Sequence, residues 1–161
     1  MTGRVVVIGV GNSFRRDDGA GPAVVEAVRF RVPDGTQLAA SDGEPGRMIS
    51  LWNRHDHVVI VEVVHARPSR PGRLHHVSAE RVAGLAGRRG STHALGLAET
   101  VALATVLDRM PCSLVVHAVE GGDFTFGTGL SAPVAAALPR LIHRVTRTAC
   151  DAHLLLRNRS R

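Results

Sequence analysis

The sequence predicts an α/β protein, in which helices cover both faces of a twisted, mostly parallel sheet of about five strands. Short apolar runs rich in β-branched residues alternate with longer segments of helical periodicity. Hydrophobic residues make up 44% of the chain but aromatic residues only 3%, so the core must consist of Val, Leu, Ile and Ala. This composition is typical of a sheet buried on both faces. We therefore expect a three-layer α/β/α fold.

The first part of the chain runs from a strand through a turn into a helix. Residues 4–10 are an uninterrupted apolar run, which predicts a buried strand. A glycine-rich turn follows, and valines and alanines along one side extend the next helix to about residue 31. Asp17 or Asp18 can cap that helix, and Pro22 suits its first turn.

The next part adds two strands to the sheet. Residues 36–41 form a short strand after a Pro–Gly break, and residues 42–46, DGEPG, form the loop at its end. Residues 48–54 predict a short helix. Residues 57–64 predict a third buried strand, whose only acidic residue is Glu62.

The remaining chain completes the sheet and its helical layers. One short run, RLHHVSA, is expected to be an edge strand, and Pro139 is expected to kink or split the last helix. No repeat or shift in composition marks a boundary, so residues 1–161 are expected to form one domain. The predicted elements are an edge strand at 73–79, a helix at 94–108, a strand at 113–119, an irregular loop at 120–129, and a helix from about 131.

The charge pattern argues against a nucleic-acid partner. The net charge is +6 and comes from Arg, since the chain contains no Lys. The Arg residues are scattered, and no aromatic residues stand among them as platforms for bases. A docking surface for an acidic protein is the better expectation.

The sequence also predicts the cellular compartment and the redox state of the cysteines. It has no signal-peptide pattern and no apolar stretch near the roughly eighteen residues of a membrane span. Its two cysteines, Cys112 and Cys150, form no C-x-x-C motif. We expect a reduced, cytoplasmic monomer without membrane insertion.

Acidic residues gather at the carboxyl ends of the predicted parallel strands, where α/β folds form their sites. Asp18 and Asp42 follow strands, and Glu62 lies within one, where a carboxylate is costly unless it is paired or bound to a cation. His93, at the start of the helix at 94–108, can converge with Asp18 and Glu62 into an open site for a transition-metal ion. Each also has a plain structural interpretation, as a helix cap for Asp18 and His93 and as an Arg partner for Glu62.

Other motifs are incomplete. The stretch GVGNSF begins like a dinucleotide fingerprint, but Phe14 replaces its third Gly, and Asp17 and Asp18 would repel a pyrophosphate. A nucleotide-binding oxidoreductase, with Asp42 on the ribose, is the weaker alternative. There is neither a P-loop lysine nor a Gly-x-Ser-x-Gly elbow. Among the other histidines, only His65 and His117 end strands near a possible cleft.

Four segments together resemble the nickel–iron hydrogenase maturation proteases. VVVIGVGNSFRRDDGAGPAVVEAV is similar to their N-terminal signature, and DHVVIVEVV to their second acidic segment. STHALGLAETVALA resembles their His-x-Leu-Gly-Leu segment, and HAVEGGDFTFGTGLSAPVAAAL their final strand, loop and helix. The likeness covers nearly the whole chain in the expected order.

This resemblance implies an endopeptidase that removes the C-terminal extension of a hydrogenase large-subunit precursor after nickel insertion. It implies that Asp18, Glu62 and His93 read the nickel, which the precursor supplies and the resting enzyme need not hold. Asp42 and Gly43 match a segment expected to contact the substrate. The chain departs from the family at Glu62, where Asp is common, and after Gly43, where Glu-Pro replaces Gly-Thr.

The resemblance leaves the chemistry open between two routes. The metal can polarise the scissile carbonyl or lower the pKa of a water, or a carboxylate can act as general base in an aspartic-type hydrolysis. A non-catalytic, nickel-dependent docking protein for the same precursor would need the same three ligands. Cleavage is the observation that separates a protease from that alternative.

Overall fold

The central sheet has the predicted class and connectivity. The computed structural model describes residues 3–83 and 92–159, and within the second range it describes side chains from 96 to 158. Five strands lie in the order β2-β1-β3-β5-β4, with β4 antiparallel at one edge and all other pairs parallel. The strands are β1 (Val5–Val10), β2 (Gln37–Ser41), β3 (His57–Val64), β4 (Leu74–Ser78) and β5 (Ser113–Glu120).

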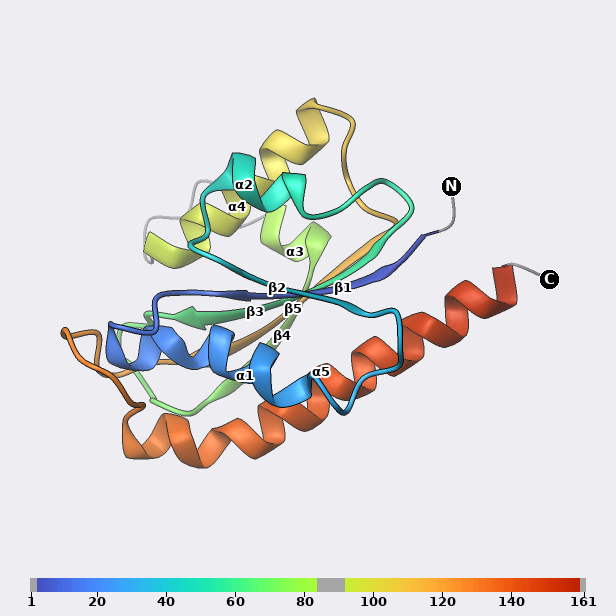
Figure 1. Cartoon of the computed structure of the whole chain (residues 1–161). Helices are drawn as coiled ribbons and strands as arrows, with labels where there is room; N and C mark the ends of the chain where they lie inside the picture. Colours follow the sequence, from blue (N-terminus) through green and yellow to red (C-terminus); the bar gives the residue numbers. More distant parts are fainter. Residues whose placement is uncertain (1–2, 84–91, 160–161) are drawn as a thin grey trace.

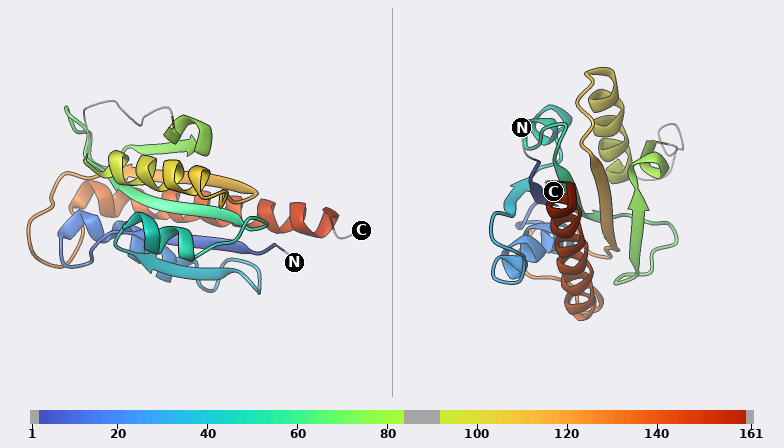
Figure 2. Two further views of the ribbon diagram at one scale, coloured as in Figure 1. Left: turned by 90° about the horizontal axis from the view of Figure 1, so that it is seen from above. Right: turned by 90° about the vertical axis from the view of Figure 1, so that its right-hand side faces the viewer.

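Helices cover both faces of this sheet, which confirms the three layers (Figure 1). On one face lie α1 (Ala20–Val28) and α5 (Ala132–Arg159). On the other lie α2 (Pro45–Ser50), α3 (Ala79–Ala83) and α4 (Thr92–Val106). Figure 2 shows the C-terminal end of α5 extending beyond the sheet. Among the helices that the structure describes, none is both long and apolar enough to span a membrane.

Strand alternation divides the core between the two faces. Val59 and Val61 of β3 pack in the cluster with α1 and α5. Val58 and Ile60 pack in the cluster with α2 and α4. Because side chains alternate along a strand, Glu62 belongs to the face that carries α4.

One helix begins earlier than predicted, and another lacks its predicted cap. The helix expected at 48–54 is α2, which begins at Pro45 because the Glu44 carboxylate accepts the N–H groups of Gly46 at 2.9 Å and Arg47 at 2.8 Å. The first helix, α1, starts after Gly19 with no side-chain cap, so the expectation that Asp17 or Asp18 caps it was wrong.

The last helix is not split at Pro139. It runs unbroken for 28 residues, although a proline inside a helix removes one backbone hydrogen bond. Val134 and Ala137 before the proline and Leu141 after it are all buried in one cluster. Packing against the sheet on both sides of Pro139 therefore keeps the helix continuous.

Candidate active site

The glycine-rich turn after β1 packs directly onto the acidic pair. Gly11 has φ of +141°, and a Cβ added there would lie 1.9 Å from the carbonyl oxygen of Asp18. Only glycine combines this backbone conformation with such a close approach. Asp17 and Asp18 lie in a short 3₁₀ helix, Arg16–Gly19, that connects this turn to α1.

Asp17 is a structural clamp. Its side chain is fully buried, and it accepts the N–H groups of Gly122, Asp123 and Ser131 at 2.8, 2.9 and 2.7 Å. The Ser131 hydroxyl donates a fourth bond at 2.8 Å. Burial acts to raise the pKa of Asp17, but these four bonds outweigh it and hold the pKa below its usual range. Asp17 thus fixes the loop after β5 against the turn after β1.

The clamped loop also covers the end of β3. The ring of His65, the first residue after β3, stacks on Phe124 with centroids 3.3 Å apart. His65 is thus placed by packing against the loop. Its position after a strand was the only sequence feature that pointed to it.

Asp18 has a different environment from its neighbour. Its side chain is 7% exposed, and Oδ2 accepts the backbone N–H of Asn12 at 2.8 Å. The other oxygen, Oδ1, is buried and has no hydrogen-bond partner in the described part of the chain. A buried carboxylate oxygen without a donor is unfavourable. This oxygen is therefore suited to bind a cation or a donor from another molecule.

Glu62 reaches the same end of the sheet from the neighbouring strand. Its side chain is 5% exposed, and it follows Val61, which is in register with Gly9 of β1. The next residue of β1, Val10, is the last of that strand. Glu62 therefore lies level with the carboxyl end of β1, where the glycine-rich turn begins.

Helix α1 starts directly over this strand end. A Cβ added at Gly21 would lie 2.4 Å from the carbonyl oxygen of Val10 and 3.0 Å from that of Val61. The absence of a side chain lets the helix sit on the two strands. The structure thus places Asp18 and Glu62 at the carboxyl ends of adjacent strands, as predicted.

The start of α4 also lies at the carboxyl end of the sheet. A Cβ added at Gly96 would lie 3.9 Å from the carbonyl oxygen of Gly43, in the loop after β2. His93 is the second residue of α4, and its side chain lies outside the described residues. Among described side chains, no three His, Cys, Asp or Glu form a possible metal site. The trio of Asp18, Glu62 and His93 therefore stays a prediction.

The two residues expected to contact substrate lie in that same loop. Asp42 is 60% exposed on its side chain and forms a salt bridge with Arg47. The hydrogen bond from Arg47, with help from the Glu44 N–H, holds the pKa of Asp42 below its usual range. Gly43 has φ of +85°, and a Cβ there would lie 3.1 Å from a methyl group of Val10. Both residues lie at the carboxyl end of the sheet, where Asp18 and Glu62 also lie. Their contact with substrate stays a prediction.

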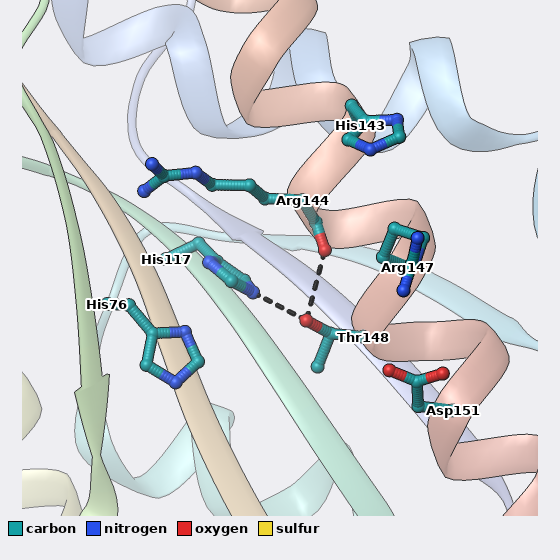
Figure 3. Close-up of a pocket in the computed structure, with 7 residues that line it drawn as sticks. All are labelled: His76, His117, His143, Arg144, Arg147, Thr148 and Asp151. Atoms are coloured by element: carbon teal, nitrogen blue, oxygen red, sulfur yellow. Dashed lines mark hydrogen bonds between the residues drawn. The ribbon is translucent and has the colours of Figure 1, made fainter.

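His117 points toward α5 (Figure 3). It therefore lies on the face of the sheet opposite to the one that carries Glu62 and α4. It is 2% exposed and in register with Val61, and its Nε2 lies 2.8 Å from the Thr148 hydroxyl of α5. That hydroxyl donates to the carbonyl of Arg144 at 3.0 Å, so Nε2 carries the proton and donates to Thr148. Burial, followed by the charges of His76 and Arg144, lowers the pKa of His117 to about 4. The hollow of about 400 Å³ beside it is therefore separate from Asp18 and Glu62.

The known proteins that this sequence resembles are described as hydrogenase maturation or hydrogenase expression/formation proteins. The family model described as hydrogenase maturation protease matches residues 23–148, a range that includes Glu62 and His93. The hydrogenase 2 maturation protease of Escherichia coli strain K12 is 25% identical over 144 residues, covering 88% of each chain. The hydrogenase expression/formation protein HupM of Azotobacter chroococcum is 29% identical over 145 residues, covering 86% of this chain and 69% of HupM.

Two solved structures of hydrogenase maturation proteases have the same fold as this chain. The hydrogenase maturating endopeptidase HybD from E. coli has a TM-score of 0.74 and 26% identity, covering 88% of this chain and 89% of HybD. HybD from Thermococcus kodakarensis, at 21% identity, shares the fold with a TM-score of 0.72, covering 91% of this chain and 99% of that one. Because the family model spans most of the sequence, this chain belongs to the hydrogenase maturation protease family.

Proposed function

We propose that this protein is an endopeptidase that removes the C-terminal extension from the nickel-loaded large-subunit precursor of a nickel–iron hydrogenase. The observation that carries the proposal is the buried Oδ1 of Asp18, which has no donor in the described part of the chain. It lies at the end of β1, beside the strand that holds the buried Glu62. Membership of the family supplies the reaction class, since its members are maturation proteases.

In this proposal, nickel arrives as part of the substrate. Asp18 and Glu62, together with His93 from α4, occupy coordination positions that the precursor leaves vacant. Carboxylates and imidazole are suitable ligands for a first-row divalent ion. Binding that depends on these three ligands would select the loaded precursor over the empty one, so cleavage follows metal insertion.

Hydrolysis requires an activated water at the scissile carbonyl. In one route, the carboxylate of either Asp18 or Glu62 leaves the nickel and takes the proton of that water as general base, which makes the reaction aspartic-type. Alternatively, the precursor's nickel lowers the pKa of the water and the same carboxylates position the metal. Replacing nickel by zinc in the precursor separates these routes. A metal-activated water shifts the pH profile of cleavage with the identity of the metal, whereas a carboxylate base leaves it in place.

The first test combines purified protein with the precursor, with and without nickel, and reads the precursor's intact mass. We expect loss of a C-terminal peptide from the nickel-loaded form alone. Binding without a change in mass would instead assign a docking role. His93→Ala should abolish cleavage with the fold retained, while His143→Ala, an exposed position on α5, should cleave at the normal rate.

A further inference from the structure

Two large aromatic side chains stand in solvent close to the acidic turn. Phe14 is 69% exposed and Phe126 is 85% exposed. The whole chain has only four Phe, one Trp and no Tyr. Phe30 is exposed as well. Phe14 and Phe126 differ from it because they belong to two segments that are hydrogen-bonded to each other, and exposed apolar side chains that gather in one place mark an interaction site, whereas single ones do not.

Hydrogen bonds join the turn at residues 14–16 to the loop at residues 126–128, and together these two segments form one surface, called the platform below. The N–H of Gly127 donates to the carbonyl of Phe14 at 2.9 Å, and the N–H of Arg16 donates to the carbonyl of Gly127 at 3.0 Å. The Arg16 guanidinium also donates to the carbonyl of Thr128 at 2.9 Å. The turn that carries Phe14 and the loop that carries Phe126 therefore form one ordered unit. Binding there loses little backbone freedom.

The arginines of this platform add positive charge. The Arg15 guanidinium lies 5.8 Å from the centroid of the Phe126 ring, and its Nε donates to the carbonyl of Phe124 at 3.3 Å. Within the described residues, Arg15 forms no salt bridge with an acidic side chain, whereas Arg16 interacts electrostatically with Asp123 of the loop that carries Phe126. Phe and Arg are both enriched at protein–protein interfaces relative to the rest of the surface.

A hollow of about 350 Å³ opens next to this platform. Ser13, the neighbour of Phe14, lines one part of it, and Gly129 and Leu130 of the clamped loop line another. Arg16 and Pro22 also line it. It can accept a side chain from a partner that already contacts the aromatics.

We propose that Phe14, Arg15 and Phe126 form a docking surface for the folded body of the hydrogenase large-subunit precursor. This inference rests on the proposed function. The partner segment is apolar and carries a carboxylate that faces Arg15. Two observations favour the precursor over a second copy of this chain. First, the platform continues along the chain into the 3₁₀ helix that holds Asp18, so a protein bound to the platform also reaches the candidate site. Second, a net charge of +6 makes two copies of this chain repel each other.

The test compares Phe14→Ala/Phe126→Ala with Phe30→Ala. Phe30 is 92% exposed but follows the far end of α1, so Phe30→Ala removes one exposed ring at a position away from the platform. Each variant is measured for its Kd for the nickel-loaded precursor and for the KM and kcat of processing. We expect the double variant to raise Kd and KM by about tenfold or more, with kcat changed by less than about twofold. Phe30→Ala should change none of them.

Arg15→Glu provides a second variant that leaves both rings in place. It should weaken binding of the precursor by about tenfold and reduce the salt dependence of Kd. An unchanged Kd in both platform variants would overturn the docking surface. So would a wild-type dimer in sedimentation that the double variant abolishes, because the occupant would then be a second copy.

The readouts also keep the two proposals apart. A wild-type protein that binds the precursor without cutting it would refute the protease function, while the Kd values of the platform variants would still decide the docking surface. A wild-type protein that cuts, with platform variants that bind and cut equally well, would refute the docking surface alone. Absence of wild-type binding would overturn both.

Discussion

Asp17 and Ser131 are joined by two hydrogen bonds, one from the Ser131 N–H at 2.7 Å and one from its hydroxyl at 2.8 Å, across 114 residues of sequence. The neighbouring carboxylate of Asp18 accepts one backbone bond, from Asn12, and keeps a buried oxygen without a donor in the described part of the chain. The two adjacent residues, Asp17 and Asp18, therefore have separate roles. One assembles the site, and the other is available to a ligand.

Asp17→Asn should lower the free energy of unfolding by about 2–4 kcal/mol. Both carboxylate oxygens of Asp17 accept hydrogen bonds, so the amide NH₂ of asparagine must face at least one N–H donor. Urea unfolding at neutral pH measures the change. Asp34→Asn, at an exposed acid, is the matched control. A loss below about 0.5 kcal/mol would show that Asp17 does not hold the loop.

Asp18→Asn should give the opposite combination, a stable protein without protease activity. The asparagine carbonyl can still accept the Asn12 N–H, and removal of a buried charge costs the fold little. Processing of the nickel-loaded precursor should fall by at least about a hundredfold, the scale of one general base. Intact-mass kinetics and urea unfolding measure the two effects. Normal processing would remove Asp18 from the site, and Asp151→Asn controls for charge.

Two substitutions at Glu62 test whether the charge and the exact position of its carboxylate are needed for processing. Glu62→Gln keeps the size of the side chain but removes its charge, so processing should fall by at least about a hundredfold. Glu62→Asp keeps the charge but withdraws it by one bond length, so we expect activity between that of Glu62→Gln and wild type. Single-turnover rates with the loaded precursor compare the three proteins. Equal rates for Gln and wild type would contradict a role for this carboxylate.

His117 should make stability depend on pH. Its pKa is lowered from 6.5 to about 4 in the folded protein, so between these values the unfolded chain binds more protons. The free energy of unfolding should therefore fall as the pH drops from about 6.5 to about 4, by on the order of 3 kcal/mol. Urea titrations of wild type and His117→Gln measure this slope. Parallel slopes would contradict the assignment, and His143→Gln is the exposed control.

Apolar patterning was sufficient to predict the sheet. Valine-rich runs located β1 and β3, and the segment at 73–79 was predicted to be an edge strand, where the structure has β4. The site prediction drew on the rule that carboxyl strand ends converge, and it placed Asp18 and Glu62 at one end of the sheet. These features depend on local sequence and general topology.

Features that depend on distant partners were not predictable. Local spacing suggested that Asp17 caps a helix, whereas its four donors come from a loop more than a hundred residues away. The start of α2 was misplaced because Glu44, an unusual capping residue, takes over that role. Continuity of α5 through Pro139 depends on burial along both sides of the proline, which only the assembled sheet supplies.

The clamp between Asp17 and Ser131 also dictates when the acidic turn can exist during translation. A ribosome that has made β1, α1 and the middle strands has not yet supplied the donors of residues 122–131. The nascent chain therefore carries both acids without the partners that separate their roles. Only after Ser131 has left the exit tunnel can the turn adopt its final shape, so the acidic turn is completed only in the nearly full-length chain.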